Sequence, residues 1–150
     1  MRDDMKSVKF DRASLKTGVL LIDRQHEAYF KLVEEFLALV EGGDVDRTQL
    51  DTEVNKIVEY AVEHLDAEEH LMRSSNYPAY EVHLAKHNIF RNKLDGFTSE
   101  LKTEVPMGPF LKRLSKWLVA WFTIQILVDD QQLAAFLHQS ESAKQSRPSR

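Results

Sequence analysis

Two pairs of residues with metal-binding side chains lie four positions apart in the chain. His64 and Glu68 form the first pair, and His83 and His87 form the second. Four residues make slightly more than one turn of an α-helix, so the two members of a pair lie on one helix face. The face that carries His64 and Glu68 is otherwise apolar, so we expect it to point into the core. An unpaired buried carboxylate is very costly there, and a metal ion is the simplest explanation.

Two further residues extend this set of donors. His26 belongs to an apolar stripe near the N-terminus, and Asp130 follows the most apolar stretch of the chain. Together with the two pairs they give four histidines and two carboxylates directed at one interior. Six nitrogen and oxygen donors exceed the needs of one tetrahedral zinc ion and match two metal ions bridged by carboxylates.

Several other metal chemistries are excluded by the residue types. The chain has no cysteine, which removes thiolate zinc, iron–sulfur clusters and c-type haem and leaves iron, manganese or zinc. Neither the Glu-x-x-His motif of ferritin-like bundles nor the HExxH motif of zinc peptidases occurs. His70 and His138 lie off the apolar stripes, and we interpret both as surface residues.

The composition is that of one globular domain. The 150 residues are 43% hydrophobic and 29% charged, with a net charge of −4. This mildly acidic balance is unfavourable for nucleic acid, and the first twenty residues lack the apolar segment of a signal peptide. The most apolar run, 117–128, is too short to span a membrane. We therefore expect a cytoplasmic protein that binds neither nucleic acid nor membrane.

The spacing of apolar residues predicts four long helices. The first runs over 23–40 with Asp23 as its N-cap, and the second runs over 47–74 with Asp46 as its N-cap. The third has Pro78 in its first turn and a seam over 80–101, and the fourth covers 110–137, with Val128 on its apolar face.

These helices predict an all-α fold, an up-down-up-down four-helix bundle with an N-terminal extended arm over 1–21. The domain then covers 1–138. The polar segment 139–150 is predicted to be a disordered tail or the stub of a linker.

Four stretches resemble bacterial hemerythrins. They are GVLLIDRQH at 18–26, the HLDAEE block with LM after it at 64–72, YPAYEVHLAKH at 77–87 and WFTIQILVDDQQL at 121–133. The resemblance covers about 10–138. It implies a four-helix bundle that holds a non-haem di-iron centre and binds O2 reversibly.

The resemblance also implies a role for each donor. His26 and His64 would bind the iron that has an open coordination position, and His83 and His87 would bind the second iron. Glu68 and Asp130 would bridge the two ions together with an oxygen derived from solvent, giving an oxo- or hydroxo-bridged centre.

The fourth helix departs from the family pattern at Gln125. The family pattern there is Trp-x-x-x-His-x-x-x-x-Asp, and this chain has Trp121, Gln125 and Asp130. Gln125 therefore stands where the second iron's third histidine is expected. Its amide oxygen either binds that iron weakly or makes a hydrogen bond nearby. Either arrangement predicts weaker iron retention and faster oxidation to the ferric state than an intact site would show.

Four apolar residues next to the expected ligands are candidates for an O2 pocket. An apolar pocket would protect bound O2 from water and protons. Ordinary core packing explains the same residues equally well: Leu65, Trp121, Phe122 and Ile126.

Three functions remain open from the sequence. The first is an O2- or redox-sensing domain, because a centre that oxidises readily serves as a switch; its partner would be a C-terminal output domain such as a diguanylate cyclase. The second is a stand-alone O2 carrier or storage protein. The third is a di-iron enzyme that reacts with peroxide or nitric oxide, although no acid–base group is evident beyond the ligands.

Overall fold

Helices make up almost all of the chain that the structure describes. The computed structural model describes residues 12–43 and 45–145, and no strand occurs among them. The elements are α1 (Arg12–Leu15), α2 (Leu20–Glu41), α3 (Arg47–Ser74), α4 (Tyr80–Leu101), α5 (Met107–Gln125), the π-helix η1 (Ile126–Asp130) and α6 (Gln131–Gln145). None of these helices is long and apolar enough to cross a membrane.

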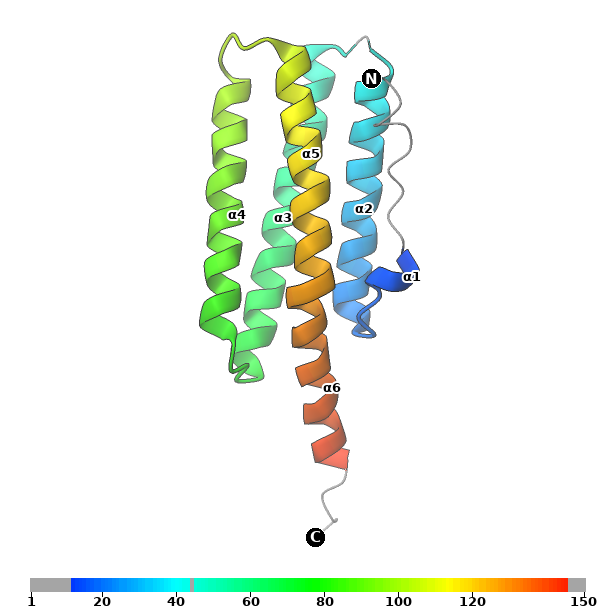
Figure 1. Ribbon diagram of the computed structural model, residues 1–150, viewed down its shortest axis with the longest axis vertical. Helices are drawn as coiled ribbons and strands as arrows, with labels where there is room; N and C mark the ends of the chain where they lie inside the picture. Colours follow the sequence, from blue (N-terminus) through cyan, green and yellow to red (C-terminus); the bar gives the residue numbers. More distant parts are fainter. Residues whose placement is uncertain (1–11, 44, 146–150) are drawn as a thin grey trace.

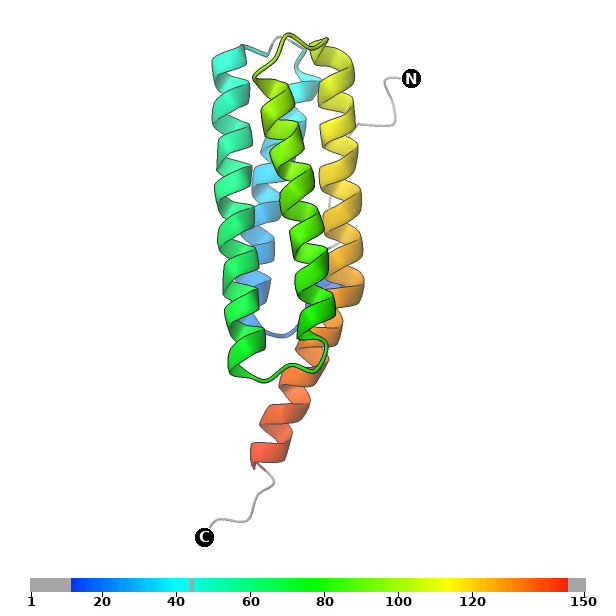
Figure 2. The same cartoon turned by 90° about the vertical axis from the view of Figure 1, so that its left-hand side faces the viewer.

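Helices α2 to α5 form the predicted all-α bundle with up-down-up-down topology. Consecutive helices run antiparallel, and α5 lies beside both α4 and α2 (Figure 1 and Figure 2). Helix α6 continues from α5 through η1 and extends past the lower end of the other three helices as drawn in Figure 1. One end of the bundle carries the α4–α5 connection and is here called the loop-closed end. The other end carries the α3–α4 connection, and α6 projects from it (Figure 1).

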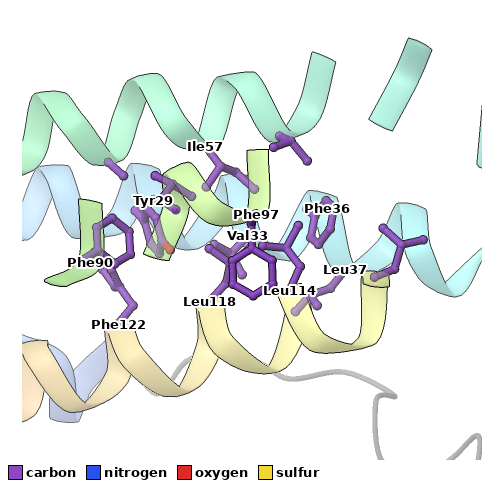
Figure 3. Close-up of a cluster of buried hydrophobic side chains, with 14 of the residues drawn as sticks. Tyr29, Val33, Phe36, Leu37, Ile57, Phe90, Phe97, Leu114, Leu118 and Phe122 are labelled. Atoms are coloured by element: carbon purple, nitrogen blue, oxygen red, sulfur yellow. The ribbon is translucent and has the colours of Figure 1, made fainter. Parts of the chain in front are cut away.

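A dense apolar cluster fills the bundle from its loop-closed end to its middle. Figure 3 shows side chains from all four helices meeting there, among them Val33, Ile57, Phe97 and Leu114. A smaller cluster lies at the other end and consists of Ile22, Met72, Tyr77 and Leu133. Burial of such side chains supplies most of the stability of a bundle. The stretch between the two clusters is where polar side chains enter the interior.

Helix α3 is the element that the sequence predicts best. It covers Arg47–Ser74 as expected, and the Asp46 side chain caps it by accepting from the backbone N–H of Thr48 at 3.4 Å. Asn76 then adopts a positive φ of 55°, and the chain changes direction there. Pro78 lies in the turn before α4, not in the first turn of that helix as predicted.

The beginning of the chain differs from the predicted extended arm. Residues 1–11 lie outside the described part, but Arg12–Leu15 form the short helix α1. Helix α2 begins at Leu20, so Asp23 is not its N-cap. The Asp23 carboxylate instead accepts from the backbone N–H and hydroxyl of Thr17 at 2.8 and 2.6 Å. It therefore fixes the segment that leads into the helix.

The fourth predicted helix also needs correction. It begins at Met107, with Pro109 in its first turn, where proline is tolerated. It is interrupted by η1, and the helix then continues to Gln145, so residues 139–145 are helical and not disordered. The alternative, that they are the stub of a linker, stays a prediction. Residues 146–150 lie outside the described part. Val128, expected on the apolar face, is 46% exposed because the π-helix changes the helical phase.

Candidate metal centre

Most polar residues of the interior gather near the end of the bundle from which α6 projects. His26 lies early in α2, His64 and Glu68 lie late in α3, and His83 and His87 lie early in α4. Because neighbouring helices are antiparallel, these positions meet at one level. Asp130 joins them from η1, and the side chains of all six residues are buried.

The π-helix explains how α5 and η1 present Gln125 and Asp130 to the same interior. In a regular α-helix two residues five positions apart point in directions about 140° apart. A π-helix has i→i+5 hydrogen bonds and a wider turn, so such residues share a face. Gln125 directly precedes η1 and Asp130 ends it, and their exposed fractions are 4% and 1%.

Both carboxylates present one oxygen to each side of the cluster. Glu68 Oε2 lies 3.0 Å from His64 Nε2, while Glu68 Oε1 lies 2.6 Å from His83 Nε2 and 3.6 Å from His87 Nε2. Asp130 Oδ2 lies 2.8 Å from His26 Nε2, while Asp130 Oδ1 lies 3.2 Å from His83 Nε2. Two groups of donor atoms result, and Glu68 belongs to both: His26, His64, Glu68 and Asp130 in one, and Glu68, His83 and His87 in the other.

Most of these short contacts are not hydrogen bonds. Both Glu68 oxygens and the Nε2 atoms of His83 and His87 are buried without a hydrogen-bond partner in the described structure. His83 Nε2 lies 2.6 Å from Glu68 Oε1 and His87 Nε2 lies 3.6 Å from the same oxygen, and neither contact is a hydrogen bond. Buried polar atoms are nearly always paired in proteins. Atoms that converge without pairing are what a metal site requires, so the donor set fits two bridged ions.

The electrostatics show how strongly these groups interact without a metal. Burial by itself would lower the pKa of His83, but the adjacent carboxylates of Asp130 and Glu68 favour its charged form and raise the pKa to about 10. Burial opposes the charged form of His64 as well, yet Glu68 raises its pKa above the usual range. The pKa of Asp130 is raised by burial and by Glu68. Glu68 keeps its charge despite burial, because His64 holds its pKa well below the usual value.

Two of the candidate ligand histidines have partners that orient their rings. His64 Nδ1 lies 2.8 Å from Gln25 Oε1, and His87 Nδ1 lies 3.0 Å from Glu69 Oε2. Arg91 donates in turn to Glu69. An acceptor at Nδ1 fixes the proton there and leaves Nε2 free for a metal ion. These partners were not predicted from the sequence, although Glu69 directly follows the candidate ligand Glu68. On the facing helix α4, His87 and Arg91 lie four residues apart.

Gln125 does not make the nearby hydrogen bond that we considered. Its side chain is buried, and neither amide atom has a hydrogen-bond partner within residues 12–43 and 45–145. An unpaired buried amide costs about 1–3 kcal/mol. The other alternative, a weak bond from the amide oxygen to a metal ion, therefore gains support.

The four predicted pocket residues do not share one environment, and Phe122 lies beside two of the candidate ligands. The Phe122 ring lies 5.6 Å from the His26 ring and 5.9 Å from the His64 ring, centre to centre. Leu65 packs in the main apolar cluster. Trp121 stacks on Phe90 at 3.9 Å, and the side chain of Ile126 lies outside what the structure describes.

Phe30 is a neighbour of His26 that we did not predict as part of the site. Its ring centre lies 6.2 Å from that of His26. Both residues line a cavity of about 230 Å³ with Leu15, Lys16, Asp23, Arg24 and Glu27. The apolar stripe of the first predicted helix already contained Phe30, four positions after His26.

Comparison with known proteins identifies hemerythrins, both by a family model and by individual relatives. The family model named hemerythrin HHE cation binding domain matches residues 17–137 of this chain. The chain is 26% identical over 137 residues to bacteriohemerythrin of Stenotrophomonas maltophilia, covering 88% of this chain and 86% of the relative. It is 25% identical over 105 residues to bacteriohemerythrin of Pseudomonas aeruginosa, covering 69% and 67%. No solved structure matched.

Proposed function

Because the chain belongs to the hemerythrin family, we propose that the buried cluster holds two iron ions and binds O2 or a related small ligand. The observation that carries this proposal is the placement of the carboxylates, since Glu68 and Asp130 each turn one oxygen toward each group of histidines. When two ferrous ions are bound, they supply the electrons that make O2 binding favourable.

Each residue of the chain has a distinct task in this proposal. His26 and His64 would hold one iron, and His83 and His87 would hold the other. Glu68 and Asp130 would fix the separation of the two ions. The unpaired amide of Gln125 supports a role as a weak third donor beside the second pair of histidines.

The cavity beside His26 supports ligand access on that side. It borders His26 and is partly lined by the apolar side chains Leu15 and Phe30. Phe122 packs against both histidine rings of this group and excludes water from it. A site with few competing proton donors retains bound O2 longer.

A sensing role is favoured by the position of Asp130. This ligand candidate is the last residue of η1, and α6 begins at the next residue. Gln131 donates to the backbone oxygen of Lys16 at 2.9 Å, so the N-terminal segment is tied to the same point. A change in how Asp130 is held would therefore reach the projecting helix without a long chain of contacts.

The test begins with iron content and an absorption spectrum of the reduced protein before and after exposure to air. We expect two iron ions per chain and a new visible band in air. One-way conversion to the ferric form supports sensing, and a band that disappears under argon supports carriage. Protein that retains less than one iron, or whose spectrum ignores air, would overturn the proposal.

Sensing has a second readout in amide hydrogen exchange. We expect the reduced and air-oxidised forms to differ in exchange within α6 and residues 15–19. The loop-closed end of the bundle serves as the internal control, because it is remote from the centre. Equal exchange of α6 in both forms would exclude sensing and leave O2 binding intact.

A further inference from the structure

A cleft between α4 and α5 opens beside Gln125. Its volume is about 160 Å³, and its lining residues come from α4, α5 and η1: Lys86, Ile89, Trp121, Ile124, Gln125 and Asp129. Ile89 and Ile124 are 65% and 63% exposed, whereas Gln125 is only 4% exposed. The cleft therefore leads from two surface isoleucines to a buried amide.

The cleft is separate from the cavity beside His26. That cavity is lined by α2 and the segment before it, and it shares no residue with the cleft. The cleft lies against α4, the helix that carries His83 and His87. The two openings thus approach the cluster from the sides of its two histidine groups.

We propose that this cleft serves a second exchangeable ligand position, on the iron held by His83 and His87. The inference rests on the proposed di-iron centre. The amide oxygen of Gln125 is a weaker donor than an imidazole nitrogen, so a small anion that enters the cleft displaces it. The exchange replaces one electron-pair donor by another and involves no oxidation or reduction.

The cleft determines the class of ligand. A water molecule takes about 30 Å³ in the liquid, so the 160 Å³ of the cleft hold about five waters and admit an ion of two or three heavy atoms. Its walls are largely apolar, which favours poorly hydrated ions. The Lys86 ammonium group lies at its rim, 2.6 Å from Asp129 Oδ1, and its side chain is 45% exposed. This ion pair leaves the rim without net charge, so a small monoanion such as azide, cyanate or hydroperoxide would have its charge compensated by the iron and not by Lys86.

The main experiment counts bound azide on the intact, air-oxidised protein after its iron has been quantified. Absorption and calorimetric titrations should give two azide ions per chain for the natural sequence and one for Gln125→His, because an imidazole closes the second position. A chelator should also remove one iron at least tenfold faster from the natural protein than from Gln125→His.

Blocking the cleft provides a test that leaves Gln125 unchanged. Ile89→Trp should slow binding of the second azide at least tenfold and leave the first unaffected. Val82→Trp is the matched control, since Val82 lies on the same helix, is 62% exposed and does not line the cleft. Circular dichroism establishes that each variant is folded.

The outcomes separate this inference from the proposed function. Two iron ions with a single azide in the natural protein would overturn the second position and leave the di-iron centre standing. Two azide ions in both the natural protein and Gln125→His would also overturn it, because binding would then not depend on this residue. Less than one iron per chain would instead contradict the proposed function.

Discussion

At the scale of single residues, the candidate ligands depend on neighbours that hold them. The His87 ring is fixed through Nδ1 by Glu69, and Glu69 is held by Arg91. A carboxylate in this position fixes the tautomer of the ring and makes Nε2 a stronger donor. Glu69 is thus a positioning residue whose contribution should appear in metal affinity and not in the fold.

Glu69→Gln should weaken binding of one of the two iron ions by about 10- to 100-fold. The amide retains the shape of the side chain but removes the charge that supports the His87 proton. Competition with a chelator measures the affinity of each ion. Glu59→Gln on the exposed face of α3 is the matched control. Equal affinity in both variants would show that Glu69 does not support the ligand.

Sequence reasoning reached the candidate ligands because their spacing repeats on several helices. His64 with Glu68 and His83 with His87 each follow the helical period, and the structure brings both pairs to one cluster. Gln25 and Glu69 could not be assigned in this way, because an orienting contact depends on the side chain of a facing helix. Adjacent polar residues are common on solvated faces, so their position beside a ligand is a weak signal.

At the scale of elements, regular helices were predictable and irregular ones were not. The ends of α3 coincide with its cap and its turn signals. The π-helix has no comparable signature, because one extra residue in a continuous apolar stretch leaves the pattern almost unchanged. The short helix α1 depends on burial of Leu15 against the bundle, which is a tertiary contact.

Gly18→Ala tests how the segment before α2 is held. Gly18 has a φ of +81°, and a Cβ atom there would lie 2.9 Å from His138 Nε2. We expect the free energy of unfolding in urea to fall by about 1–3 kcal/mol. Gly96→Ala is the control, because its Cβ would meet nothing within 4 Å, and it should be neutral or stabilising by about 1 kcal/mol.

The double variant Gly18→Ala with His138→Ala separates the two causes. It removes the close contact but retains the unfavourable φ, so part of the lost stability should return. No loss in the single variant would mean that the segment adopts another path and that its contact with α6 is weak.

At the scale of the whole molecule, the charges of the centre determine how stability depends on pH. The metal-free protein gains stability from protonated His83, whose pKa of about 10 exceeds its ordinary value of 6.5. A raised pKa in the folded state gives stabilisation that is complete below pH 6.5 and is lost as the pH rises toward 10. The raised pKa of Asp130 acts in the same direction, but its contribution is complete only below pH 3.8 and is lost as the pH rises from there.

Metal-free protein should therefore unfold at lower urea concentration as the pH increases across this range. The iron-loaded protein should not show this loss, since metal binding needs deprotonated ligands and becomes tighter at higher pH. His83→Asn should flatten the curve of the metal-free protein, whereas exposed His70→Asn should leave it unchanged. A metal-free curve that rises with pH would contradict this account.

The wide turn of η1 also sets the direction in which α6 faces. The turn of η1 contains about one residue more than a turn of a regular α-helix. This extra residue rotates the following helix, α6, by about 100° around the helix axis. Gln131 and His138 meet the backbone of Lys16 and Thr17 only in that orientation. Conversion of η1 to a regular α-helical turn would therefore rotate α6 about its own axis instead of bending it. Any group of residues packed on α6 would then be displaced by a rotation.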